Sequence, residues 1–318
     1  MNSKLTALTL LSALLSAPLA HADEAKDARL ARQLNLTKAS LRHQGRDRTF
    51  YYHGRINQRS KALKPVLFVL HGGGGSGPDT ANKTGYNPVA QDNGFLVVYP
   101  NGWQGNWNDG RGKPAATGVD VSNIDDVGFF RKLFDYTAQT LKGDPQRFYV
   151  TGLSNGGTMS YRLGIELTDR IAAIAPVIAN LTGPLQTATP KRPLPVLIMN
   201  GTADPLMHWG GSTNPDGSVA QLSTPETVTW WIRHNAQRRL VLPRSEHLPN
   251  VNRQDDSTVE VTTYTGLVAP VVLYTIHGGG HTFPGSDVKD VPQLVGAKNM
   301  DIDGREEVWA FVSQFKLD

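Results

Sequence analysis

A serine lies at the centre of the pentapeptide Gly152-Leu153-Ser154-Asn155-Gly156, which has the G-x-S-x-G spacing of a nucleophile elbow. Residues 147–151, directly before it, form an apolar and β-branched run typical of a buried strand, and a helical pattern opens at Met159. A strand, a tight turn and a helix require glycines where the backbone is crowded. The motif therefore predicts Ser154 as a nucleophile, and a surface Ser-Gly turn is the alternative.

A serine hydroxyl attacks only when a histidine takes its proton and a carboxylate orients that histidine. On this type of scaffold the acid and then the histidine follow the serine in the chain. Asp204 lies just past an apolar run that ends at Asn200, where open α/β sheets place working residues. We expect Asp204 to be the acid, with a turn aspartate before proline as the alternative. His281, in a glycine-rich loop, is the expected base, and His277 is its competitor.

His277 and His281 also have the H-x3-H spacing of some zinc sites. No obvious third ligand accompanies them, and the pair does not lie in a helical pattern, so we expect no metal site and no cofactor. An oxyanion intermediate needs backbone N–H donors, which we expect from Asn155 and from the glycine-rich loop at residues 71–75. A phosphate-binding loop is the alternative for residues 71–75, but no G-K-[ST] follows.

The elements that must position these residues alternate between strands and helices. Helical patterns are expected near residues 125–141, from residue 224 and at 304–315. Strands are expected at residues 49–52, 65–70, 95–99, 147–151, 171–177, 196–200, 259–264 and 271–276. This alternation predicts a mostly parallel central sheet with helices on both faces, and with the elbow it indicates the α/β-hydrolase fold. Only about 18 residues separate the runs that end at Val177 and begin at Val196, so we expect no large cap domain.

The first residues have a different character. Residues 5–19 are apolar but too short to cross a bilayer, and Ala20-His21-Ala22 resembles a cleavage site. We therefore expect residues 1–22 to be a signal peptide, with a membrane anchor as the alternative, and residues 23–318 to be a single catalytic domain. The chain has no cysteine, which is compatible with a periplasmic or extracellular protein without disulfides.

The charge pattern argues against two classes of partner. The 318-residue chain has a formal net charge of +4, and its lysines and arginines are scattered without a basic block. Such a balance gives no reason to expect binding to nucleic acid or to an anionic membrane. The sequence indicates a small ester or oligoester as the partner and does not indicate an oligomeric state.

Several longer motifs carry a family resemblance. They are Leu70-His71-Gly72-Gly73, Tyr99-Pro100-Asn101-Gly102, Asn106-Trp107-Asn108, Asp125-Asp126-Val127-Gly128-Phe129, residues 149–157, residues 200–205 and residues 279–285. In this order they cover nearly all of the chain after residue 22, which resembles the secreted esterase family of polyhydroxybutyrate depolymerases, feruloyl esterases and acetylxylan esterases. The resemblance implies a Ser154-Asp204-His281 triad and an oxyanion hole at Gly73 and Asn155.

Three tryptophans, Trp103, Trp107 and Trp209, fall in loops expected at the rim of the site. Their rings could stack on a sugar, an aromatic acid or an acyl chain, and we assign Trp107 and Trp209 to substrate binding, with ordinary packing as the alternative. We call the polar loop that follows Gly102 and extends to about Ser122 the tryptophan loop. For Asp126 we expect a helix cap rather than a contact that braces this loop.

The combined features predict a secreted serine carboxylic-ester hydrolase that works through an acyl-enzyme, with hydroxyalkanoate esters or oligomers as the leading substrates. A feruloyl or acetylxylan esterase is the alternative within the class. A peptidase and a non-catalytic binding protein with the same fold also stay open, because specificity lies in loop geometry.

Overall fold

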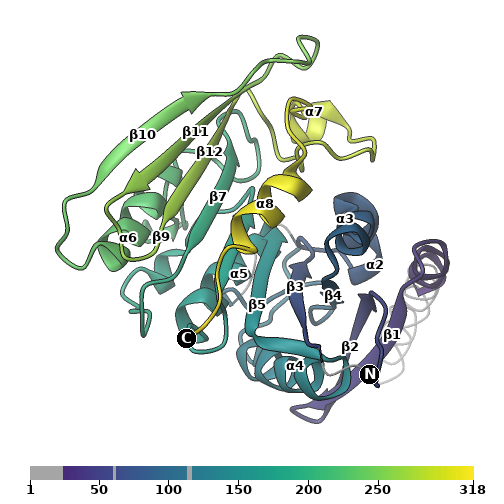
Figure 1. Ribbon diagram of the computed structural model, residues 1–318. Helices are drawn as coiled ribbons and strands as arrows, with labels where there is room; N and C mark the ends of the chain where they lie inside the picture. Colours follow the sequence, from purple (N-terminus) through teal and green to yellow (C-terminus); the bar gives the residue numbers. More distant parts are fainter. Residues whose placement is uncertain (1–23, 60–61, 113–116) are drawn as a thin grey trace, which may run out of the picture.

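A ten-stranded sheet is the centre of the protein. Figure 1 shows the computed structural model, which describes residues 24–59, 62–112 and 117–318. The expected signal peptide at residues 1–22 lies outside the described residues. The strands follow one another across the sheet in the order β1-β2-β4-β3-β5-β6-β7-β12-β11-β10. These strands are β1 (Thr37–His43), β2 (Arg46–His53), β3 (Lys64–Leu70), β4 (Leu96–Pro100), β5 (Gly143–Leu153), β6 (Ala173–Val177), β7 (Val196–Gly201), β10 (Leu242–His247), β11 (Thr258–Thr265) and β12 (Val271–His277).

The centre of the sheet is parallel, as expected. Strands β4, β3, β5, β6, β7 and β12 pair in parallel, and antiparallel strands extend the sheet at both edges. Parallel strands need crossover connections, and helices provide most of them here. The carboxyl ends of β3, β5, β7 and β12 therefore meet at one edge, so the loops that follow these strands converge there.

Helices cover both faces of the sheet. They are α2 (Gly77–Thr84), α3 (Tyr86–Asn93), α4 (Asp126–Thr140), α5 (Asn155–Glu166), α6 (Thr224–Ala236), α7 (Pro292–Val295) and α8 (Gly304–Val312). Alternate residues of β3 show the division: Phe68 packs in a core with α4, α5 and α6, whereas Leu67 packs in a second core with α2, α3 and α8. We call the first the α5 face and the second the α8 face. Both faces of the sheet are buried under hydrophobic cores, which explains why the sequences of its central strands are continuous apolar runs.

The connection between β6 and β7 contains one short 3-10 helix, η1 (Gly183–Leu185), and no cap domain. A small two-stranded sheet of β8 (Ser212–Thr213) and β9 (Val219–Gln221) lies in the next connection. Among the described residues no helix is long and apolar enough to cross a membrane.

The edges of the sheet differ most from expectation. Residues 24–46 contain a helix over residues 24–33 and then the edge strand β1, and that strand was not expected. The other edge strand, β10, is exposed along its whole length and is polar apart from its first two residues. Ala39 and Leu41 of β1 are only partly buried against the α5 face, and β10 buries no residue, so the hydrophobic alternation by which strands are recognised is weak in β1 and absent from β10.

Candidate active site

Ser154 stands between β5 and α5 in a backbone conformation that few non-glycine residues adopt. Its φ is 55° and its ψ is −121°. Such strain, of the order of 1–3 kcal/mol, is characteristic of functional turns. The two glycines of the motif are required by crowding: a Cβ on Gly152 would lie 2.5 Å from the carbonyl of Gly156, and one on Gly156 would lie 2.4 Å from the carbonyl oxygen of His71. The geometry is that of a nucleophile elbow.

Asp204 and His281 form a buried hydrogen-bonded pair beyond the ends of β7 and β12. The distance from His281 Nδ1 to Asp204 Oδ2 is 2.7 Å, and the exposed fractions of the two side chains are 10% and 1%. The other carboxylate oxygen of Asp204 accepts the backbone N–H groups of Leu206 at 2.8 Å and Met207 at 2.7 Å. Since the carboxylate accepts, Nδ1 of His281 carries the proton and Nε2 is left as the basic nitrogen.

Close backbone packing brings these two loops together. The amide of Ala203 donates to the carbonyl of Gly279 at 3.0 Å, and a Cβ on Gly201 would lie 2.2 Å from the same oxygen. The amide of His281 donates to the carbonyl of Val295 at 2.5 Å. The glycines are therefore needed for close approach between the acid loop and the histidine loop, rather than for mobility of the imidazole.

The serine is not hydrogen-bonded to the histidine in this structure. Among the described residues, no hydrogen bond joins Ser154 Oγ to His281. Catalytic hydrogen bonds are often long before substrate binds and shorten in the complex with substrate. Ser154, Asp204 and His281 all follow strands of the parallel centre, at the same edge of the sheet.

Gly73 and Asn155, expected to form the oxyanion hole, lie side by side. A Cβ on Gly73 would be 3.9 Å from Cβ of Asn155, and one on Gly72 would be 3.5 Å from Cβ of Ser154. The amide of Asn155 is the first of α5, where helices leave N–H groups without intrahelical acceptors. Among the described residues the Gly73 amide also has no acceptor. Two N–H donors thus flank the serine.

His71 holds the glycine-rich loop at residues 71–75 in place through its side-chain hydrogen bonds. The sequence did not indicate this role. Nε2 of His71 accepts the amide of Gly102 at 2.8 Å, so Nδ1 carries the proton and donates to the carbonyl of Gly72 at 2.7 Å. The ring is completely buried, and this burial lowers the pKa of His71 to about 4. His71 is therefore neutral at pH 7 and links the loop after β3 to the loop after β4.

Trp107 does not lie on the rim. Its side chain is fully buried, its indole Nε1–H donates to the carbonyl of His71 at 3.0 Å, and its ring packs against Phe130. The expectation that Trp107 binds substrate is therefore wrong, because its ring has no face open to a ligand. The residue supports the glycine-rich loop at residues 71–75 instead.

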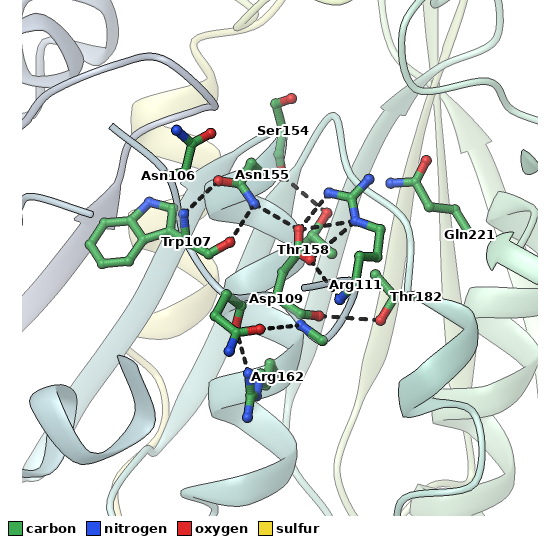
Figure 2. A network of polar contacts seen from close by, with 12 residues as sticks. Asn106, Trp107, Asp109, Arg111, Ser154, Asn155, Thr158, Arg162, Thr182 and Gln221 are labelled. Carbon is green, nitrogen blue, oxygen red and sulfur yellow. Dashed lines mark hydrogen bonds and ion pairs between the residues drawn. The ribbon is translucent and has the colours of Figure 1, made fainter. Parts of the chain in front are cut away.

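A polar network anchors the start of α5 to the tryptophan loop (Figure 2). The Asn155 side chain accepts the amide of Trp107 at 2.9 Å and donates to its carbonyl at 3.1 Å, and it also donates to Asp109 at 2.7 Å. Asp109 is fully buried, and the guanidinium of Arg111 lies against its carboxylate at 2.5 Å. No sequence signal indicated Asp109, because its partner Asn155 is 46 residues away, and the role of Arg111 depends on its pairing with Asp109.

The expectation for Asp126 is also wrong. Asp125 caps α4, accepting the amide of Gly128 at 2.8 Å. Asp126 is buried, pairs with Arg48 at 2.5 Å and accepts the amide of Asn108 at 2.8 Å. It therefore braces the tryptophan loop. Two adjacent aspartates at a helix start do not show which one turns back to the helix.

Trp103 and Trp209 are partly exposed. The guanidinium of Arg46 lies 5.1 Å from the Trp103 ring centre, and Trp209 packs at the margin of the α5-face core. His277 pairs with Glu260 at 3.1 Å, whereas His281 pairs with Asp204. Within the described ranges no three metal-ligating side chains gather.

Comparison with known proteins finds several esterases among the relatives of this chain. The chain is 33% identical over 275 residues to a protein named "Putative esterase NocK" from Nocardia uniformis subsp. tsuyamanensis, covering 81% of this chain and 77% of the relative. It is 28% identical to feruloyl esterase B of Piromyces equi and 24% identical to poly(3-hydroxyalkanoate) depolymerase C of Paucimonas lemoignei. These matches cover 80% and 69% of this chain but only 42% and 50% of the two relatives. No family model matches the chain.

Among solved structures, an acetyl xylan esterase from Aspergillus awamori has a similar fold. The TM-score is 0.54 at 14% identity, covering 87% of this chain and 99% of the other. A structure described as a thermostable esterase gives a TM-score of 0.50 at 12% identity, covering 88% of this chain and 63% of the other. At this low identity the likeness concerns the fold alone, which is that of an α/β-hydrolase, as the sequence predicted.

Proposed function

The chain belongs to the esterase family that includes NocK, and from this premise we propose that Ser154, His281 and Asp204 are the triad of a secreted serine carboxylic-ester hydrolase. The observation that carries the proposal is the buried 2.7 Å hydrogen bond between His281 and Asp204, at the sheet edge where Ser154 adopts its strained turn. A histidine held in this tautomer is ready to accept a proton at Nε2.

The reaction follows from the positions of these groups. Ser154 Oγ attacks the ester carbonyl carbon while His281 Nε2 takes the hydroxyl proton. The N–H groups of Gly73 and Asn155 stabilise the negative oxygen that develops. His281 then protonates the leaving alcohol, an acyl-serine remains, and water activated by His281 hydrolyses it. Asp204 stabilises the imidazolium that forms in each step.

The leading substrate class is a hydroxyalkanoate ester or oligoester, supported by the similarity to the depolymerase of Paucimonas lemoignei. A feruloyl ester is the second candidate, because two relatives named feruloyl esterase B are 28% and 30% identical. Trp209 is the residue that we assign to substrate contact, since its ring is partly exposed and it follows the Asp204 loop.

Secretion and a single catalytic domain at residues 23–318 complete the proposal. The sequence of residues 1–22 supports export, and a single ten-stranded sheet with two flanking cores supports one folded unit after it. Detection of a mature chain that begins at Asp23 in the exported fraction would verify this part.

The test of the triad is the Ser154→Ala variant, with Ser160→Ala as the matched control on the same helix. We expect Ser154→Ala to lose hydrolysis of 4-nitrophenyl butyrate and labelling by a fluorophosphonate, while Ser160→Ala keeps both. The Ser160 hydroxyl only bonds the carbonyl of Gly156 within α5. Undiminished turnover by purified Ser154→Ala would reject the serine, and a wild-type protein that never reacts with the probe would be a non-catalytic scaffold.

A further inference from the structure

Two side chains beside the proposed site have N–H donors without an acceptor. Arg111 binds Asp109 through Nε and Nη2, which leaves Nη1 without a partner among the described residues. Gln221, on β9, has an exposed fraction of only 7%, and no acceptor in the described part of the chain lies within hydrogen-bonding distance of its buried Nε2. A buried unpaired amide costs about 1–3 kcal/mol, so such a group calls for an explanation.

The two donors face each other. Figure 2 shows the amide nitrogen of Gln221 directed toward the guanidinium of Arg111, beside the elbow that carries Ser154. Thr182 connects the two segments: its hydroxyl donates to the carbonyl of Asp109 at 3.3 Å, and its backbone bridges that of Gln221. The carbonyl of Gln221's side chain is directed to the hydroxyl of Ser212, at 3.4 Å, so the amide nitrogen is the end that faces Arg111.

The position of Arg111 and Gln221 relative to His281 indicates which half of the ester would lie beside these two side chains. The histidine loop runs into the α8 face, where Phe283 packs near Tyr86, whereas Leu181 and Leu222, next to Thr182 and Gln221, belong to the α5 face. His281 must protonate the leaving alcohol, so the alcohol lies on the histidine side. The acyl group then extends to the opposite side of Ser154, toward Arg111 and Gln221.

Resting on the proposed ester hydrolysis, we propose that Arg111 and Gln221 form an acyl-side subsite for a second, uncharged oxygen acceptor on the acyl group. A hydroxyl, ketone or ester oxygen would accept from both N–H groups. Asp109 already neutralises Arg111, so a carboxylate would add an unbalanced negative charge beside the oxyanion hole. The subsite therefore selects oxygenated acyl groups over hydrocarbon chains and over carboxylates.

Matched 4-nitrophenyl esters test this assignment. The 4-oxopentanoyl, 4-methylpentanoyl and succinyl esters have the same heavy-atom shape, and the 3-hydroxybutyryl and 3-methylbutyryl esters form a second pair. Isosteres that lack an expected acceptor are rejected when buried donors would stay unpaired. For the wild type we expect kcat/KM to be about tenfold higher for at least one oxygenated ester than for its methyl isostere, and the succinyl ester to be the poorest of its set.

The variant Gln221→Met has nearly the same length but no donor, and Gln221→Glu offers Arg111 Nη1 an acceptor within the protein. In both we expect the oxygenated-to-methyl ratio of kcat/KM to fall about tenfold, whereas Gln314→Met, at an exposed position just after α8, keeps the wild-type ratio. The ratio is taken within one protein, so a partly unfolded sample does not change it. Arg111 is left unaltered because its loss would leave Asp109 buried without a counter-ion.

Two results would overturn the subsite. One is a ratio that is the same in Gln221→Met and in the wild type, and the other is a preference for the succinyl ester over the 4-oxopentanoyl ester. Either could occur while Ser154→Ala still abolishes hydrolysis, and then the ester hydrolase stands without this subsite. Absence of hydrolysis of all five esters by the wild type would instead reject the proposed function on which the subsite depends.

Discussion

The side chain of Asn155 pairs with the backbone of Trp107 through two hydrogen bonds, of 2.9 and 3.1 Å, as one strand residue pairs with another. The residue whose amide is proposed to bind the oxyanion is therefore also the residue that fixes the tryptophan loop. Asp109 holds the same amide group from the other side at 2.7 Å. The position of the α5 N-terminus thus depends on contacts outside the elbow itself.

We expect Asn155→Leu, which keeps the number and branching of the side-chain heavy atoms, to lower kcat about tenfold or more with a smaller effect on KM. It leaves the buried amide of Trp107 without an acceptor and removes one donor from the carboxylate of Asp109, at a cost of about 2 kcal/mol in the free energy of unfolding, and it loosens a donor that acts mainly in the transition state. Steady-state kinetics and urea unfolding measure the two effects. Ser160→Ala is the control, and a rise in KM alone would show that Asn155 contacts substrate instead.

A second prediction concerns Trp107. Trp107→Phe retains a ring but loses the donor to the carbonyl of His71, so we expect the free energy of unfolding to fall by about 1–2 kcal/mol; Trp107→Ala should lower it by about 3–5 kcal/mol. The partly exposed Trp103 provides the control, because Trp103→Phe should change stability by less than about 1 kcal/mol. If Trp107→Phe altered KM without any loss of stability, the ring would be a substrate contact after all.

The burial of His71 predicts how stability depends on pH. The folded-state pKa of about 4 lies below the ordinary value of 6.5, so the folded protein favours the neutral ring. The contribution of the neutral His71 ring to the free energy of unfolding is complete above pH 6.5 and declines as the pH falls toward 4. It amounts to about 3 kcal/mol across that window. Protonation of His71 would also remove the acceptor for the Gly102 amide and so loosen the glycine-rich loop at residues 71–75.

The measurement compares urea unfolding of the wild type and of His71→Gln at pH 7 and at pH 4.5. Other groups titrate in both proteins, so the difference between their pH dependences isolates the ring. We expect the variant to lose less stability than the wild type between the two pH values. Equal losses in both proteins would mean that His71 is not the responsible group.

The sequence predicted best what is encoded locally. The apolar runs of β3, β4 and β7 and the glycines around Ser154 have local physical causes, since a strand that is buried on both faces must be apolar and a crowded turn must lack side chains. The positions of Asp204 and His281 followed from the rule that loops after parallel strands converge at one edge. Their hydrogen bond agrees with that expectation.

What could not be predicted depends on partners distant in the chain. Trp107 is a support rather than a rim residue because His71 and Phe130, from two other elements, enclose it. Asp126 turns to Arg48, which is 78 residues away, rather than to its own helix. A tryptophan or an aspartate in a polar loop looks the same in sequence whether its partner is solvent, substrate or a buried side chain.

The last prediction concerns the tautomer of His281, and Asp204→Asn tests it. Oδ1 of Asp204 accepts two backbone N–H groups, from Leu206 and Met207, so the oxygen of an asparagine would occupy that place and its NH2 group would face His281. Nδ1 of His281 would then have to accept, Nε2 would carry the proton, and the ring could not deprotonate Ser154. We expect kcat for 4-nitrophenyl butyrate to fall by about 10³-fold or more, with the fold retained. A variant with near wild-type kcat would show that another group orients the histidine, and Asp216→Asn, an exposed aspartate on the same connection, provides the control.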